Sequence, residues 1–412
     1  MISFSQDGLQ KWLASFDLHR FGTAYACTIG VICCLAYAAT QSPSSRIRWW
    51  MLVPITGLTM TTARSVLDIP AFSPFRVAIG MTLGVNLVLE SINHLCIRKV
   101  FIDLNKRPKG ESAVYYALRQ GTDLVFNKRL IGTAHQVKGV PKFSSKDPSY
   151  VPSRTQFITF RATRAILLYL VLGMLLREPP PEIVSFCRPS DRTSFPIRLV
   201  QGTVGTEEFT TRFAFTLSYL ASSVLFQILG HDCISLIAVG ILNNDPAAWP
   251  PRFDSITTAY TIRRFWNPFW HQDLRATLTC YSPLISDNIL QLPKKGVLQR
   301  YAKIYLGFGI SGLMHIYSDL ASNVPLSETK AMNYFLLSAT GVLIEDLAIA
   351  IYRLAVPDRG SAGQPPLWQK VVGFLWTLFY TSLVTPQWAC TLVLGGTLPM
   401  PGFPRLESST PP

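Results

Sequence analysis

Long apolar blocks separated by polar segments dominate the pattern of this 412-residue chain. The clearest blocks are residues 21–39, 77–97, 213–242, 304–320, 331–352 and 371–394, with shorter ones at 49–62 and 157–176. A helix that crosses a bilayer needs roughly 20 mostly apolar residues. The pattern therefore predicts an all-α, polytopic transmembrane helical bundle of about eight spans. The block 213–242 is long enough for one tilted span or for a helix with a re-entrant end.

Composition supports an integral, multi-pass membrane protein. Hydrophobic residues make up 49% of the chain and charged residues 15%, whereas soluble domains carry about 25% charged residues. Residues 1–20 are charged and lack an apolar run, so we expect an N-terminal segment without a cleavable signal. Residues 21–395 are expected to form a single transmembrane domain, and 396–412, rich in Pro and Ser, a flexible tail.

The eight cysteines are scattered and form no CxxC pair. Cysteines of this kind are typical of small core residues. We therefore predict neither a disulfide framework nor a metal site from them.

Charge placement predicts the orientation of the chain. Residues 98–160 hold 12 Lys/Arg against 4 Asp/Glu, and 243–301 hold 7 against 4, whereas 177–212 is balanced at 5 against 5. Basic loops stay in the cytosol, so both basic loops are expected there, with 177–212 on the other side. Attraction to anionic lipid headgroups explains the basic charge without nucleic acid. A basic face would also gather a phosphate-bearing substrate.

Residues 249–275, WPPRFDSITTAYTIRRFWNPFWHQDLR, are the most unusual polar segment. Aromatic residues beside Arg263 and Arg264 are typical of a belt at the membrane–water boundary. They equally suit a large charged ligand, because arginine grips phosphate and tryptophan stacks on rings. The belt interpretation does not explain His271, which lies between Trp270 and Gln272.

A second chemical feature is His315, which follows the glycine-rich stretch GFGISGLM at 307–314. If the span enters from the cytosol near Ile304, His315 lies about 17 Å along it. Burying an ionisable group in the hydrocarbon is costly, so such a residue is a functional candidate. The alternative is a histidine that only forms an interhelical hydrogen bond. The glycines allow close helix approach or leave room for a substrate.

Three other polar groups interrupt apolar blocks, and interhelical packing is the simplest role for each. Two adjacent acids point in different directions on a helix, so at least one must face a polar partner. A metal site at the His-Asp-Cys triplet is not expected, because no further His or Cys has ligand spacing. These groups are Asn86, Glu90 and His94; His231, Asp232 and Cys233; and Glu345 with Asp346.

Residues 263–272, RRFWNPFWHQ, preceded by PPRF at 250–253, resemble the RxFWxxxWHQ signature of wax-synthase-like proteins. These proteins are a branch of the membrane-bound O-acyltransferase superfamily. SGLMH at 311–315 is similar to the second element of that family, a membrane-embedded histidine after small residues. The acids of GVLIED at 341–346 fit the span that follows. The resemblance covers residues 213–394, and its motif core is 249–320.

The resemblance implies transfer of an acyl group from acyl-CoA to a hydroxyl inside the membrane. His315 would be the catalytic base, and His271 would orient the thioester or stabilise the oxyanion. No Cys or Ser nucleophile stands out near them, so direct transfer is expected, with acyl-CoA as co-substrate and no permanently bound cofactor or metal. The residues expected to frame the coenzyme A entrance are Arg263, Trp266, Trp270 and Gln272 at fixed motif positions, and Arg264 and Asn267 at variable ones.

Among members of this superfamily the chain looks most like fungal O-acetyltransferases of terpenoid and meroterpenoid secondary metabolism. The resemblance thus implies acetyl-CoA, a hydrophobic alcohol acceptor and the endoplasmic reticulum membrane, with no nucleic-acid partner. One alternative is a wax-ester synthase that uses long-chain acyl-CoA and fatty alcohol. A membrane transporter would show repeated, broken segments in its two halves, and the sequence has none. An inactive lipid scaffold is the third alternative, although His271 and His315 are intact.

Overall fold

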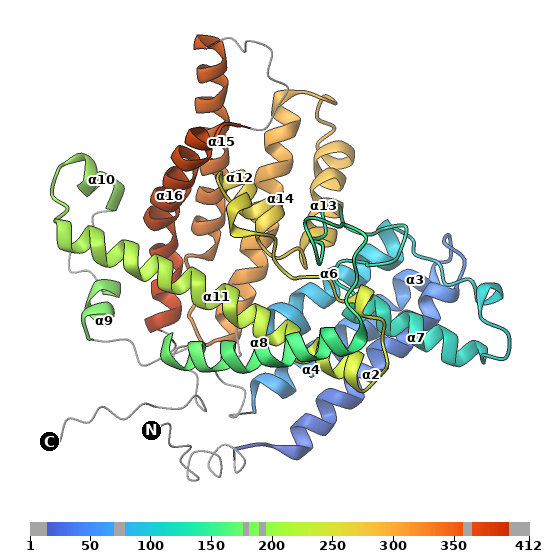
Figure 1. Ribbon diagram of the computed structural model, residues 1–412. Helices are drawn as coiled ribbons and strands as arrows, with labels where there is room; N and C mark the ends of the chain where they lie inside the picture. Colours follow the sequence, from blue (N-terminus) through green and yellow to red (C-terminus); the bar gives the residue numbers. More distant parts are fainter. Residues whose placement is uncertain (1–14, 70–78, 176–180, 189–194, 357–364, 395–412) are drawn as a thin grey trace, which may run out of the picture. The chain divides into compact units, whose positions relative to one another are not determined.

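The computed structural model describes residues 15–69, 79–175, 181–188, 195–356 and 365–394 (Figure 1). Every regular element in these ranges is a helix, which confirms the all-α prediction. The expected tail at 396–412 and most of the expected N-terminal segment lie outside the described residues. The chain forms two compact units, and each is described by itself.

The first unit, here called the motif unit, comprises Gly139–Gln272 and Glu328–Pro412, with Met1–Ser5. In Figure 1, α8 lies beside α11 and α15 beside α16, as their contacts require. Its long helices are α8 (Arg154–Leu175), α11 (Thr206–Gly240), α15 (Ala331–Ala355) and α16 (Leu367–Leu394). Its short ones are α9 (Pro181–Cys187), α10 (Phe195–Val200), η5 (Pro246–Ala248), η6 (Ile256–Thr258), α12 (Ile262–Arg264) and the π-helix η7 (Phe265–Phe269).

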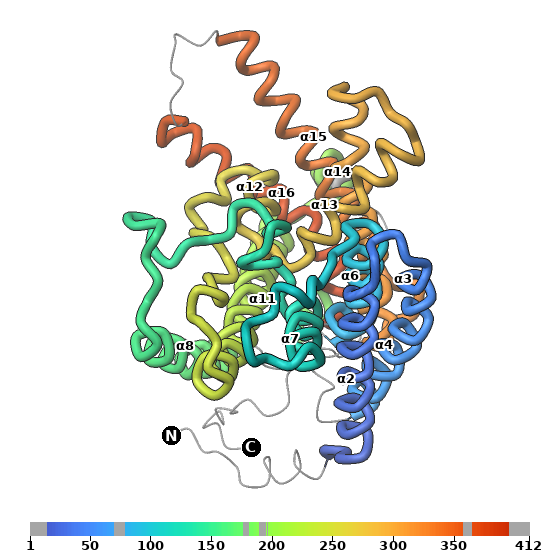
Figure 2. The backbone as a smooth tube through the Cα atoms, turned by 90° about the vertical axis from the view of Figure 1, so that its right-hand side faces the viewer, coloured from blue at the N-terminus to red at the C-terminus, as the bar shows by residue number. Residues whose placement is uncertain are grey.

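The second unit, here called the His315 unit, comprises Gln6–Lys138 and Asp273–Ser327. Figure 2 shows α2 and α4 side by side, with α7 against α2. Its helices are α2 (Leu18–Thr40), α3 (Ile47–Trp50), α4 (Leu52–Leu67), η2 (Gly80–Val85), α6 (Asn86–Ile92), η3 (Asn93–Ile97), η4 (Leu104–Lys106), α7 (Ala113–Phe126), α13 (Arg275–Pro283), η8 (Leu284–Ile289) and α14 (Val297–Ala321). Buried Val31, Leu35, Ile55 and Leu95 form the centre of its core.

Four helices of the described chain are long and apolar enough to cross a membrane, namely α2, α8, α11 and α15. Among the other predicted spans, α4 has only 16 residues, and 79–97 is divided between two π-helices and a short α-helix. The long helices α14 and α16 are not among these four. The count of eight is therefore met only in part.

The block expected at 213–242 is a single uninterrupted helix, α11, of 35 residues. Its length of about 52 Å exceeds a hydrocarbon core of roughly 30 Å. A tilted helix that extends beyond the hydrocarbon explains this length, and a re-entrant end does not.

Two of the predicted polar groups have polar partners, and one of these two packs between helices. On α6, Asn86 Nδ2 donates to Glu90 Oε1 over 3.1 Å, and Glu90 forms an ion pair with Lys128. In the motif unit, Asp232 on α11 is fully buried and forms ion pairs with Arg161 and Arg164 of α8. A buried carboxylate needs such partners, because desolvating an unpaired charge costs several kcal/mol (about 3–5 when one partner is removed).

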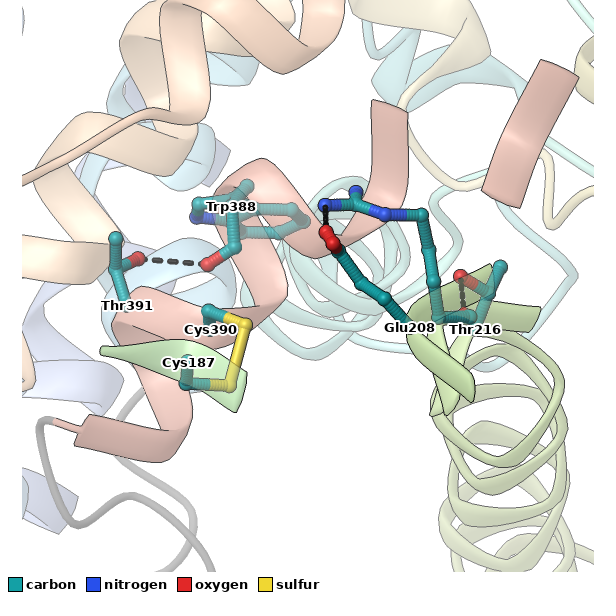
Figure 3. The surroundings of a disulfide bond; sticks show 7 residues. Cys187, Glu208, Thr216, Trp388, Cys390 and Thr391 are labelled. Atoms are coloured by element: carbon teal, nitrogen blue, oxygen red, sulfur yellow. Dashed lines mark hydrogen bonds and ion pairs between the residues drawn. A yellow bond between two sulfur atoms is a disulfide. The ribbon is translucent and has the colours of Figure 1, made fainter. Parts of the chain in front are cut away.

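The structure pairs Cys187 of α9 with Cys390 of α16 in a disulfide (Figure 3). The prediction of eight unpaired cysteines is therefore wrong at these two positions. Sequence spacing gave no signal, because 203 residues separate them. Their packing does explain the pair, since Cys187 shares a buried cluster with Phe215, Ala389 and Val393.

We expect Cys187→Ser to lower the stability of the protein by about 2–4 kcal/mol, because the disulfide closes a long loop and restricts the unfolded chain. The measurement is the thermal midpoint of the purified protein, read from the folded peak in size-exclusion chromatography after heating. Cys233→Ser, at an exposed free cysteine on α11, is the control and should leave the midpoint unchanged. Equal midpoints for Cys187→Ser and the parent protein would show that the bond does not stabilise the fold.

Candidate active site

The segment RRFWNPFWHQ begins within the short helix α12. The carboxylate of Glu345 accepts hydrogen bonds from the first backbone N–H groups of this helix. Glu345, on α15, accepts from the backbone N–H of Ile262 at 2.6 Å and of Arg263 at 3.4 Å. Thr261 adds a side-chain cap, because its Oγ1 accepts from Arg264 N over 3.0 Å. The first N–H groups of a helix have no partner within the helix, and an acid is favoured there. One carboxylate on another helix thus fixes where the motif begins.

The neighbouring acid, Asp346, forms an ion pair with Arg263. Its Oδ1 also accepts from Arg263 Nε over 3.4 Å. The two acids therefore bind different parts of the motif. Glu345 binds its backbone, and Asp346 binds its first arginine. This confirms that adjacent acids on the helix find polar partners. The side chain of Arg263 remains 36% exposed, so it can contact a second anion.

Two glycines let the chain before the motif pass close to α15 and α16. A Cβ atom at Gly373 of α16 would collide with the carbonyl oxygen of Tyr260, and one at Gly341 of α15 would lie 2.9 Å from Cδ1 of Ile262. Glu345 lies ten residues before the end of α15 at Ala355, or about 15 Å along the helix. The motif therefore packs against both helices, which the interpretation as a belt does not predict.

The aromatic residues of the motif form one packed cluster. Phe265 and Phe269 on η7 are buried, and Phe253 of the preceding PPRF packs on Phe269 and Trp270 with ring centroids at 5.8 and 5.7 Å. Trp266 lies 5.6 Å from Trp270 in an edge-to-face arrangement. Such pairs add about 0.5–1.5 kcal/mol each beyond area burial. Most of the aromatic surface thus builds the site rather than facing lipid.

The π-helix η7 ends at Phe269, and the backbone of the next residue, Trp270, is extended. His271 follows, with its ring 6.2 Å from Phe253 and partly exposed. Gln272 is buried, and its Nε2 donates to the carbonyl oxygen of Gly139 over 2.7 Å. This hydrogen bond therefore links the segment that carries His271 to the segment at Gly139.

The two residues at variable motif positions differ in their surroundings. Arg264 donates from Nε to the carbonyl oxygen of Thr258 over 2.9 Å and lies over the ring of Tyr260. Asn267 is exposed on η7. Arg264 thus braces the preceding loop.

His315 belongs to the His315 unit and lies on the uninterrupted helix α14. Its Nδ1 is 2.7 Å from the backbone carbonyl oxygen of Ser311, one turn earlier. A carbonyl oxygen only accepts, so Nδ1 carries the proton of this hydrogen bond. In the neutral ring Nε2 then carries the lone pair, the form that a proton acceptor requires. The side chain is partly buried.

Small residues bring η2 close to α14 around His315. A Cβ at Gly84 would collide with the ring of Tyr317, and one at Gly80 would lie 2.8 Å from Ala321 Cβ. Of the glycines predicted on α14 itself, Gly307 faces Ser282 Oγ and Gly309 has nothing within 4 Å. The sequence did contain the signal for Gly80 and Gly84, the Gly-xxx-Gly spacing of close helix contacts.

We expect Glu345→Leu to release the start of the motif, because two backbone N–H groups lose their acceptor. Each unsatisfied group costs about 1–3 kcal/mol of stability. The measurement is the rate of trypsin cleavage after Arg263 and Arg264 in the purified protein, which should rise. Glu207→Leu, at an exposed acid in the first turn of α11, is the matched control and should not change the rate. Unaltered cleavage in Glu345→Leu would show that this carboxylate does not hold the motif.

Known proteins similar to this chain are acyltransferases. The sequence model of the Membrane bound O-acyl transferase family matches residues 249–337. Acetyltransferase spyB of Aspergillus fumigatus is 29% identical over 365 residues, which cover 83% of this chain and 58% of that protein. Acetyltransferase ataH of Aspergillus terreus is 33% identical over 63% of this chain and 84% of its own length. Acetyltransferase TRI7 of Fusarium sporotrichioides is 28% identical over 75% and 72%.

The matched family segment includes the whole RRFWNPFWHQ motif and His315. The relatives named as acetyltransferases and the O-acyltransferase family model both support an acyltransferase enzyme. The resemblance found in the sequence is thereby confirmed: this chain belongs to the membrane-bound O-acyltransferase family.

Proposed function

We propose that this protein transfers an acetyl group from acetyl-CoA to a hydroxyl of a hydrophobic terpenoid or meroterpenoid intermediate in secondary-metabolite biosynthesis. The family and the acetyltransferase names of its relatives support the reaction class. The observation that carries the proposal is the 2.7 Å contact between Nδ1 of His315 and the carbonyl oxygen of Ser311, which favours the neutral tautomer with Nε2 as the proton acceptor.

In the proposed reaction, Nε2 of His315 takes the proton of the acceptor hydroxyl while its oxygen attacks the carbonyl carbon of the thioester. The C–S bond then breaks, the ester leaves, and the sulfur of coenzyme A receives the proton from His315. His271 would donate to the developing oxyanion or orient the thioester. The attack is direct, so no acyl-enzyme forms.

The donor is proposed to bind at the start of the motif. Arg263 keeps a partly exposed guanidinium beside its ion pair with Asp346, and guanidinium forks bind phosphate oxygens well. Trp266 and Trp270 supply flat aromatic surface for the donor. Gln272 and Arg264 support this site through the backbone contacts described above, and Asn267 is exposed at its edge.

We further propose a single transmembrane domain of about eight spans in the endoplasmic reticulum membrane. Loop charge supports this orientation, with the basic loops in the cytosol and 177–212 in the lumen. The disulfide between Cys187 and Cys390 also supports it, because disulfides persist in oxidising compartments such as that lumen. Transfer of long acyl chains to fatty alcohols, as in wax-ester synthesis, is the alternative for the same site.

We expect His315→Ala to lower acetyl transfer by about 10²–10⁴-fold, because the general base is lost. The assay measures radiolabelled acetyl moving from acetyl-CoA into solvent-extractable ester in membranes that contain the protein and a terpenoid or fatty alcohol. His135→Ala, at an exposed histidine, is the control. Full activity of His315→Ala, with normal insertion, would remove His315 as the base.

Arg263→Ala is expected to raise the KM for acetyl-CoA and leave the KM for the alcohol unchanged, because the guanidinium would contact only the donor. Asp346→Asn separates this role from a structural one, since it breaks the ion pair but keeps the guanidinium. We expect a smaller change in the acetyl-CoA KM for Asp346→Asn. Equal changes in the two variants would show that Arg263 acts only through its ion pair.

A further inference from the structure

The motif unit contains an apolar cavity of about 470 Å³ that the reaction steps above do not use. Phe265, Phe269 and Trp270 of the motif form part of its wall, together with Phe253. Its volume lies within the roughly 300–1,000 Å³ of small-molecule pockets. The cavity therefore shares side chains with the segment that carries His271.

Two helices line the cavity with one face each. The lining residues of α11 recur at the spacing of a single helical face, and those of α16 do the same. From first to last, the α11 face covers about 16 Å, so the cavity is elongated. The residues of these faces are Leu217, Leu220, Ala221, Val224, Leu225 and Ile228 on α11, and Phe374, Thr377, Leu378 and Thr381 on α16.

Arginines gather at the Ile228 end of this face. Arg164 lines the cavity and is held by Asp232 of α11, with both hydrogen bonds at 2.7 Å. Asp232 is shared with Arg161, so one carboxylate serves two guanidinium groups. Arg252 also lines the cavity and donates to Gln227 Oε1, a neutral acceptor, over 3.2 Å.

Positive charge exceeds negative charge at this end. The acid that lines the cavity is Asp254, which accepts from the backbone N–H of Ser255. The lining thus carries two guanidinium groups, those of Arg164 and Arg252, and one carboxylate in an otherwise apolar wall. A ligand that fits would be apolar along its length and would carry an oxygen acceptor at one end.

We infer that this cavity holds the body of the acceptor alcohol, an elongated apolar molecule whose non-reacting end carries a carboxylate or another oxygen facing Arg164 and Arg252. The inference rests on the proposed function for naming this molecule as the acceptor. An acetyl donor has no apolar body to fill such a chamber, whereas a hydrophobic alcohol does. The two arginines would therefore select among acceptors.

The test measures binding in the absence of acetyl-CoA, so that it does not depend on catalysis. Farnesane, farnesol and farnesoic acid serve as probes with one apolar body and increasing oxygen content. Each is titrated into purified protein in lipid nanodiscs while the fluorescence of the protein is followed. We expect affinity to rise from hydrocarbon to alcohol to acid. A hydrogen bond to a charged group accounts for a step of roughly tenfold.

Two variants probe the two ends of the cavity. Val224→Trp should weaken all three probes roughly tenfold by filling the apolar part, and Arg252→Gln should remove only the advantage of the acid. Ile234→Trp, at an exposed position of the same helix, is the control and should bind like the parent protein.

Equal binding of the three probes, or parent-like binding by both variants, would overturn the inference. If the protein binds the three probes in the expected order but transfers no acetyl group, the binding site is supported and the proposed function is contradicted.

Discussion

The motif unit depends on one carboxylate. Glu345 lies inside α15, is buried, and accepts from the backbone N–H groups of Ile262 and Arg263. A buried acid in an apolar helix is costly unless it is satisfied, and a three-residue helix such as α12 has no stability of its own. The carboxylate of Glu345 and the helix α12 therefore stabilise each other. This hydrogen-bonded start fixes the aromatic cluster of η7, the extended backbone at Trp270 and the position of His271 within the unit.

The same principle applies to His315, where a backbone hydrogen bond selects the chemistry. The carbonyl oxygen of Ser311 accepts a hydrogen bond from Nδ1–H, so the neutral ring presents its other nitrogen as an acceptor. Close contacts at Gly80 and Gly84 bring the neighbouring helix against this part of α14. In both units these polar groups have defined partners, and the partners determine what the groups can do.

Sequence patterns could predict the helices and the chemical residues but not their partners. Apolar blocks predicted α2, α8, α11 and α15, and the histidines stood out because they interrupt such patterns. The sequence did not show that Glu345 binds the backbone of the motif, because nothing in the spacing of residues 262 and 345 indicates contact. The disulfide between Cys187 and Cys390 and the fit of Gly373 against Tyr260 were missed for the same reason. Each is a contact between residues far apart in the chain.

A hydrophobic acceptor and a charged donor would together account for the apolar helices and the basic motif segment. Under the proposed function, apolar helices would supply the medium for the alcohol, and the basic motif segment would bind the charged donor. The most direct test is the balance of products made by the purified protein from acetyl-CoA and a terpenoid alcohol. Equal amounts of free coenzyme A thiol and acetyl ester, both dependent on the alcohol, are predicted. Thiol release without ester, or no consumption of acetyl-CoA with any hydrophobic alcohol, would contradict direct acetyl transfer.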